Sequence, residues 1–133
     1  MNQKETRWKQ RFTNFEKAWQ ALERAVRIED PSEVERGGII QFYETAFELA
    51  WKTMKDYNEA QGFITKSPRE AIKQAFQTDV IRDGHLWLEA LDDRNQTTHI
   101  YDEKIALEIV AKIRTQYFEM LTDLYRYLKN VIN

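Results

Sequence analysis

The chain has 133 residues, 42% of them hydrophobic, so we expect one domain with a real core across residues 1–133. Its formal net charge of -2 gives no global basic field for nucleic acid, so any RNA or nucleotide contact requires a local pocket. The absence of cysteine excludes disulfides, thiolate catalysis and zinc–thiolate sites.

The first segment shows the spacing of a helix that buries one narrow stripe. Its apolar residues recur at intervals of 4, 3, 4, 3 and 4, which is typical of a bundle or coiled-coil seam. The stripe consists of Trp8, Phe12, Phe15, Trp19, Leu22 and Val26. The segment "EDPSE" ends this helix, and Ser32 followed by glutamates is typical of the start of the next one.

The second helix is predicted from about Ser32 to Gln61, with Gly62 ending it. Its apolar arc is about 200° wide at 100° per residue, more than one neighbouring helix can cover. The helix should therefore lie in the middle of a bundle or pack against a second copy of the chain. The arc comprises Ile39, Ile40, Phe42, Tyr43, Ala46, Phe47, Leu49, Ala50, Trp51, Met54 and Tyr57.

The remaining surface of this helix is predicted to be polar and to contain Glu44, Glu48, Lys52, Lys55 and Asp56. Glu44, Glu48 and Lys52 are spaced i, i+4 and i+8, which favours an exposed, salt-bridged face. The alternative for these three residues is a partner-docking surface or the rim of a pocket.

Two short helices and one long helix follow. Ser67 and Pro68 indicate a helix start, and Asp83-Gly84 is a break before a helix through "HLWLEALDDRN". Asp102 is expected to open a last, continuous helix about 45 Å long. No stretch alternates with period two. The fold predicted is therefore all-α, an up-and-down four-helix-type bundle with short extra helices.

A group of polar residues between positions 94 and 101 has no evident role in packing the core. Arg94, His99 and Tyr101 form R-x4-H-x-Y, with Asn95 after the arginine. Arginine suits phosphate, and histidine exchanges a proton near neutral pH, so the pair can support metal-free RNA cleavage or simply bind a nucleotide phosphate. The alternative is a helix junction in which Arg94 pairs with a nearby aspartate, namely Asp92, Asp93 or Asp102.

Geometry constrains this motif. Residues five apart on a continuous helix point about 140° from each other, so Arg94 and His99 would not converge on one ligand. Either the helix ends near Gln96–Thr98, or a second copy of the chain completes the site.

Other chemistries have weaker signals. His85 has no second histidine at helical spacing, and adjacent Asp92 and Asp93 diverge on a helix and suggest a solvated turn, so we expect no metal and no cofactor. The G-S and D-x-D signature of a nucleotidyltransferase is missing, so this chain alone should not transfer a nucleotide. The charged start "MNQKETRWKQRF" and the lack of a long apolar run favour the cytoplasm and no membrane association.

Three stretches of the chain resemble a known family. The segments "GGIIQFYETAFELAWKTMKDY", "SPREAIKQAF" and "DGHLWLEALDDRNQTTHIYDE" resemble the nucleotidyltransferase substrate-binding proteins, small helical partners of minimal nucleotidyltransferases within the HEPN group, which includes HepT-type toxins. In HEPN ribonucleases the R-x4-6-H motif is an active site shared across a homodimer. The resemblance thus implies Arg94 and His99 as catalytic residues, Asn95 as their polar neighbour, and Tyr101 as the acceptor of AMP groups.

Two hypotheses follow from the resemblance. In the first, the chain is a homodimeric substrate-binding or regulatory subunit of a two-component minimal nucleotidyltransferase. In the second, it is a HepT-like ribonuclease toxin, neutralised when the nucleotidyltransferase antitoxin attaches AMP to Tyr101. Both imply a second copy, a nucleotidyltransferase and a nucleotide or RNA as partners.

Overall fold

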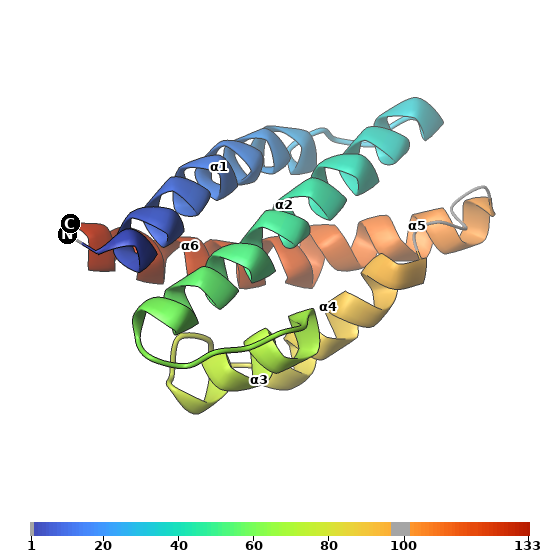
Figure 1. Ribbon diagram of the computed structural model, residues 1–133. Helices are drawn as coiled ribbons and strands as arrows, with labels where there is room; N and C mark the ends of the chain where they lie inside the picture. Colours follow the sequence, from blue (N-terminus) through green and yellow to red (C-terminus); the bar gives the residue numbers. More distant parts are fainter. Residues whose placement is uncertain (1, 97–101) are drawn as a thin grey trace.

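The computed structural model describes residues 2–96 and 102–133, which fold as helices joined by short connections (Figure 1). The two termini lie at the same end of the molecule (Figure 1). The helices are α1 (Gln3–Val26), α2 (Glu33–Ala60), α3 (Pro68–Gln77), α4 (Gly84–Gln96), α5 (Glu103–Lys112), the π-helical turn η2 (Ile113–Tyr117) and α6 (Phe118–Ile132). This arrangement confirms the predicted all-α bundle.

Helix α1 packs along α2 and also contacts α6. Its predicted stripe is correct: Trp8, Phe12, Phe15 and Leu22 are buried. Trp19 is only half-buried because it lies at the edge of the core, where its indole stacks on Tyr125 at 4.3 Å and its N–H donates to Thr122 at 2.8 Å.

Helix α2 lies in the middle of the bundle and contacts α1, α3, α5 and α6, which confirms the first explanation of its wide apolar arc. A capping box at Ser32 starts it, as the sequence predicts. Gly62, at φ 97°, adopts the left-handed conformation that suits glycine directly after it.

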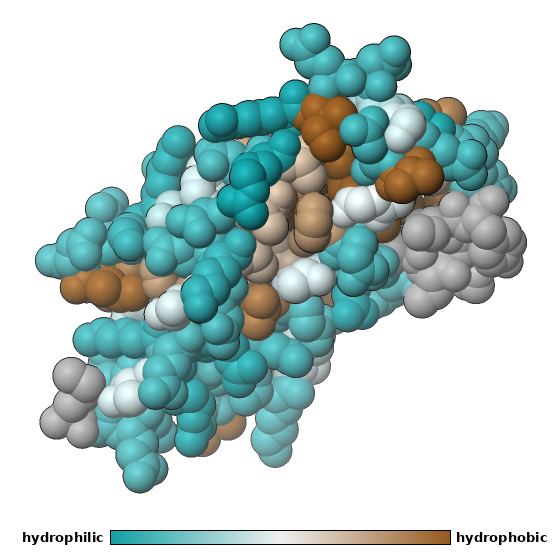
Figure 2. Space-filling view, turned by 90° about the horizontal axis from the view of Figure 1, so that it is seen from above, coloured by the Kyte–Doolittle hydropathy of each residue, from teal (hydrophilic) through white to brown (hydrophobic). Residues whose placement is uncertain are grey.

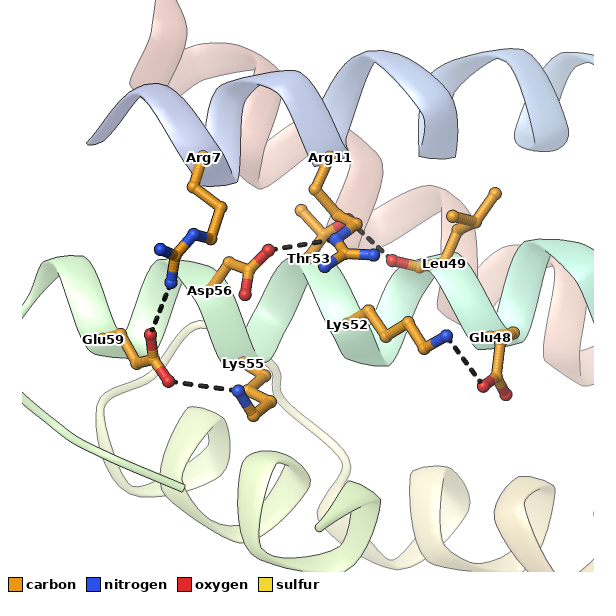
Figure 3. Close-up of polar contacts among 9 residues, drawn as sticks. All are labelled: Arg7, Arg11, Glu48, Leu49, Lys52, Thr53, Lys55, Asp56 and Glu59. Atoms are coloured by element: carbon orange, nitrogen blue, oxygen red, sulfur yellow. Dashed lines mark hydrogen bonds and ion pairs between the residues drawn. The ribbon is translucent and has the colours of Figure 1, made fainter. Parts of the chain in front are cut away.

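Phe42 of the predicted arc has 43% of its surface exposed, so the helices of one chain do not cover it. One prediction for α2 is wrong. Asp56, assigned to the polar face, is only 4% exposed, because Arg11 of α1 reaches across and its Nε lies 3.0 Å from the carboxylate (Figure 3). An arginine 45 residues away in sequence thus pairs with a carboxylate that the helical pattern alone assigns to solvent.

The predicted last helix is confirmed: α5, η2 and α6 follow one another without a gap after the N-cap Asp102, with a π turn that the sequence did not predict. Its buried residues Ile109, Ile113, Tyr117 and Leu121 are each four apart, and at 100° per residue such a series drifts by about 40° per step. The π turn η2, in which the N–H of Phe118 donates to the carbonyl of Ile113, takes up the extra residue. The apolar stripe therefore keeps facing the core from α5 into α6.

The short helices begin where the sequence indicates. Ser67 caps α3, with Pro68 in its first turn, and Asp102 caps α5. In α4, Trp87 and Leu91 are buried and Leu86 packs partly against the core. Within residues 2–96 and 102–133, the structure contains no helix long and apolar enough to cross a membrane.

Candidate functional site

Arg94 lies in the last turn of α4 and reaches the middle helix α2. Its Nη2 donates to Oε2 of Glu48 at 2.7 Å. The two side chains are 36% and 31% exposed, so the pair lies at the surface of the bundle rather than inside it. The expectation that Arg94 pairs with Asp92, Asp93 or Asp102 misses this contact, because the partner comes from a different helix.

The carboxylate of Glu48 collects three donors. Besides Arg94, the indole N–H of Trp51 donates to Oε2 at 3.1 Å. Nζ of Lys52 lies 3.3 Å from Oε1, and Figure 3 shows this ion pair. Burial alone would raise the pKa of Glu48, but the Trp51 hydrogen bond, Arg94 and Lys52 outweigh it and lower that pKa below its ordinary value. The predicted Glu48–Lys52 ion pair is confirmed, and Glu44 is half-buried one turn earlier.

The two residues before Arg94 bind two further parts of the fold. Asp92, 61% exposed, pairs with Arg69 of α3 at 3.4 Å. Asp93 accepts from the hydroxyl of Tyr117 at 2.5 Å and lies 3.3 Å from Nζ of Lys112. The two carboxylates diverge as predicted, but the prediction of a solvated turn is wrong for Asp93, which is only 16% exposed.

The carboxylate of Asp93 shifts the pKa values of Tyr117 and Lys112. Burial and the hydrogen bond to Asp93 raise the pKa of Tyr117 far above its usual range. Burial works to lower the pKa of Lys112, but Asp93 and Glu89 outweigh it and raise that pKa. The Tyr117 ring stacks on Tyr43 at 5.6 Å, and the Tyr43 hydroxyl donates to the carbonyl of Ala90 in α4.

Three consecutive residues thus attach the end of α4 to four neighbouring elements: Asp92 to α3, Asp93 to α5 and η2, and Arg94 to α2. Such attachment fixes the position of the Arg94 backbone before any ligand arrives, which favours recognition of a phosphate. The π turn lies directly against this point, in keeping with the frequent occurrence of π-bulges at functional sites.

Of the other motif residues, one lies within the described part of the chain and two do not. Asn95 is exposed next to Arg94. His99 and Tyr101 lie outside the described residues. Helix α4 is described as far as Gln96, so the two geometric alternatives for Arg94 and His99 stay predictions.

Sequence reasoning missed Trp51, Asp93 and Tyr117 as parts of this site. Trp51 and Tyr117 were assigned to apolar packing, because hydrophobic periodicity does not show what the indole N–H or the phenol hydroxyl bonds to. The i, i+3 spacing of Glu48 and Trp51 could have suggested their hydrogen bond.

A cleft of about 860 Å³ lies elsewhere, between the α3–α4 connection, the start of α4 and α6. Neither Arg94 nor Glu48 lines it. Its carboxylates, Asp79, Asp83, Glu119 and Asp123, outnumber its arginines, Arg82 and Arg126. An anionic nucleotide would therefore meet net negative charge there, and the Arg94 site suits a phosphate better.

Comparison with known proteins places the chain in a family. The family described as "Nucleotidyltransferase substrate binding protein like" matches residues 10–130. The chain belongs to this family. The family predicted from the "RNQTTHIYDE" block and its neighbouring segments is thereby confirmed.

A curated relative and two solved structures are also similar. The probable ribonuclease HepT of Haemophilus influenzae is 30% identical over 81 residues, and the match covers 57% of this chain and 56% of the relative, so the chain spans little more than half of it. A crystal structure from Thermus thermophilus is 35% identical, with a TM-score of 0.72, over 89% of this chain and 95% of that one. A Haemophilus influenzae structure, described as the substrate-binding domain of a nucleotidyltransferase, is 25% identical, with a TM-score of 0.81, over 89% and 98%.

The fold alone is shared with a more distant protein. A tri-AMPylated HEPN toxin of Shewanella oneidensis, solved in complex with an MNT antitoxin, is 15% identical, with a TM-score of 0.74, and the match covers 98% of this chain and 99% of that one.

Proposed function

We propose that this protein is the substrate-binding or regulatory subunit of a two-component minimal nucleotidyltransferase. The observation that carries the proposal is the match over residues 10–130 to the family described as "Nucleotidyltransferase substrate binding protein like". The Haemophilus influenzae structure described as such a substrate-binding domain supports it over 89% of this chain. The catalytic subunit supplies nucleotidyl transfer, and this chain supplies part of the pocket for the acceptor.

Arg94 is the residue on which the binding role rests. Its guanidinium is permanently charged, half-exposed and fixed at the end of α4, which suits a phosphate of the nucleotide or of the acceptor. Asn95 stands next to it and offers amide donors and an acceptor. His99 and Tyr101 complete the set in sequence.

A second function, ribonuclease activity, is favoured by the 30% identity to the probable ribonuclease HepT together with R-x4-H-x-Y. In this reaction His99 takes the proton of a ribose 2′-hydroxyl, and the 2′-oxygen forms a bond to the adjacent phosphorus while the bond from phosphorus to the 5′-oxygen breaks. The leaving 5′-oxygen takes up a proton, and Arg94 stabilises the charge on the phosphoryl group. Tyr101 is then the residue to which an antitoxin nucleotidyltransferase attaches AMP, as the resemblance of R-x4-H-x-Y to HepT-type toxins implies. The distant Shewanella toxin is itself tri-AMPylated and in complex with an MNT antitoxin.

Both functions include a homodimer. Phe42 of α2 and Leu107 of α5 are 43% and 49% exposed on helices that contact each other, and Arg36 pairs with Glu103 across the same two helices. Figure 2 shows hydrophobic atoms gathered in small groups within a largely hydrophilic face. We infer that a second copy covers Phe42 and Leu107 on these two helices.

Expression with and without the partner tests the two functions. The wild-type chain and His99→Ala are expressed alone, and growth and cellular RNA are followed. Growth arrest or RNA cleavage lost in His99→Ala supports the ribonuclease, and equal, harmless behaviour of both overturns it.

The subunit role is tested by co-expression with a minimal nucleotidyltransferase that carries the G-S and D-x-D signature and comes from the same genome. Co-purification of the two chains, with nucleotidyl transfer that requires both and falls in Arg94→Ala, is the expected result. Transfer by the catalytic subunit at the same rate without this chain contradicts the proposal.

A further inference from the structure

The carboxylate of Glu48 lies among donors that would equally suit a phosphate. Two donors come from α2, the N–H of Trp51 and Nζ of Lys52, and the third is Nη2 of Arg94 in α4, at 3.1, 3.3 and 2.7 Å. A guanidinium, an ammonium and an indole N–H are all donors without acceptor capacity, so they can be satisfied only by an oxygen of an anion or a polar group.

This donor set differs from an ordinary surface ion pair of the same helix. Lys55 and Glu59 are also spaced i, i+4, at 3.1 Å, and Glu59 also receives an arginine, Arg7, at 3.5 Å. Glu59 is only 16% exposed, whereas Glu48 is 31% exposed and both of its cations are more than a third exposed. The Glu48 carboxylate can therefore move into water at small cost, since exposed ion pairs contribute little.

We propose that Arg94, Lys52 and Trp51 form a phosphate-binding site and that Glu48 occupies it until a ligand phosphate displaces its carboxylate. The inference rests on the proposed binding role of Arg94 and extends it to α2. It assigns Lys52 and Trp51 as binding residues and Glu48 as an internal competitor.

The position of the donors supports this assignment. Arg94 follows Asp93, which is only 16% exposed and accepts from the hydroxyl of Tyr117, and Lys52 and Trp51 lie on the long middle helix. The backbones that carry the three donors therefore stay in place when Glu48 leaves. Lys52 also lies over the Trp51 ring, 6.0 Å from its centroid, which holds the two α2 donors on one side of the helix. A phosphate oxygen in place of the carboxylate accepts the same three groups.

The site predicts opposite effects for two substitutions in one turn of one helix. Glu48→Gln removes the competing charge, and Lys52→Met removes a binding charge but keeps an apolar stem. By isothermal titration with AMP and with a single-stranded RNA octamer, Glu48→Gln should tighten binding about threefold to tenfold, and Lys52→Met should weaken it by a similar factor. The ligand that responds identifies the source of the phosphate.

Glu59→Gln and Lys55→Met are the matched controls, because they make the same charge changes on α2 away from Arg94. Both should leave the dissociation constant within about twofold of the wild type, as expected for distant surface charges. If Glu48→Gln and Lys52→Met also fall within that range while Arg94→Ala abolishes binding, the inference is overturned and the role of Arg94 stands.

Two other outcomes concern Arg94 itself. If Arg94→Ala binds as well as the wild type, the proposed binding role fails, and with it the site. If neither the wild type nor Glu48→Gln binds AMP or the octamer, the binding role of Arg94 and the proposed phosphate site are both overturned. Glu48→Gln should make even a weak site measurable, because it removes the competing carboxylate.

Discussion

Two arginines from different helices each pair with a carboxylate of α2, and the pairs differ in burial. Arg11 of α1 lies 3.0 Å from Asp56, and Arg94 of α4 lies 2.7 Å from Glu48. The arginine side chains are equally exposed, at 36%, but Asp56 is 4% exposed and Glu48 is 31% exposed. The two pairs therefore have nearly the same chemistry in different surroundings.

The difference indicates which pair holds the fold together and which is available to a ligand. A carboxylate out of reach of water depends on its arginine, because removal of either partner leaves an uncompensated polar group. A carboxylate with water on one side can exchange its partner for solvent or for another anion. The Arg11–Asp56 pair is thus structural, and the Arg94–Glu48 pair is suited to binding.

The largest expected effect is a difference in the free energy of unfolding when the carboxylate of each pair is removed. Asp56→Ala should lower the free energy of unfolding by about 2–3 kcal/mol, whereas Glu48→Ala should lower it by less than about 1 kcal/mol. Urea unfolding of both variants measures the difference. Equal losses would show that burial does not distinguish the pairs.

A smaller loss of stability is expected when the hydrogen bond between Tyr117 and Asp93, the residue before Arg94, is removed. Tyr117→Phe removes the hydroxyl that donates to Asp93 and keeps the ring stacked on Tyr43, so it should cost about 1–2 kcal/mol. Asp93→Asn and the double variant complete a thermodynamic cycle. A coupling energy near zero between positions 93 and 117 would contradict the attachment of α4 to η2.

The same contrast explains how much the sequence could reveal. Stripes such as Trp8 to Leu22 and caps such as Ser32 and Ser67 depend on neighbours within one helix, and they were predicted correctly. Asp56 and Asp93 look like solvent-facing residues in any helical pattern, because their partners lie 45 and 24 residues away. Their burial follows from how the helices are arranged in space.

The π turn was missed for a related reason. Spacings of four along Ile109, Ile113, Tyr117 and Leu121 fit a regular helix over one or two steps, and the drift becomes large only over the whole series. At the site, the motif singled out Arg94, whose role in binding or catalysis stays a prediction. Its partner Glu48 was predicted only as a weak member of a polar face, since no spacing links α2 to α4.

The smallest expected effect is at acid pH and tests whether Glu48 is held ionised by its donors. Burial favours the protonated form, but the Trp51 hydrogen bond, Arg94 and Lys52 outweigh it and hold the pKa of Glu48 below its ordinary value of 4.5. A lowered pKa contributes stability that is present above the unfolded pKa and is lost as the pH falls through the folded pKa. The wild type should therefore lose stability relative to Glu48→Gln as the pH falls from about 5 to about 3, by no more than about 0.5 kcal/mol because the pair is partly exposed. Urea unfolding at a series of pH values measures this change, and a difference between the two proteins that stays constant below pH 5 would show that the donors around Glu48 do not stabilise its charge.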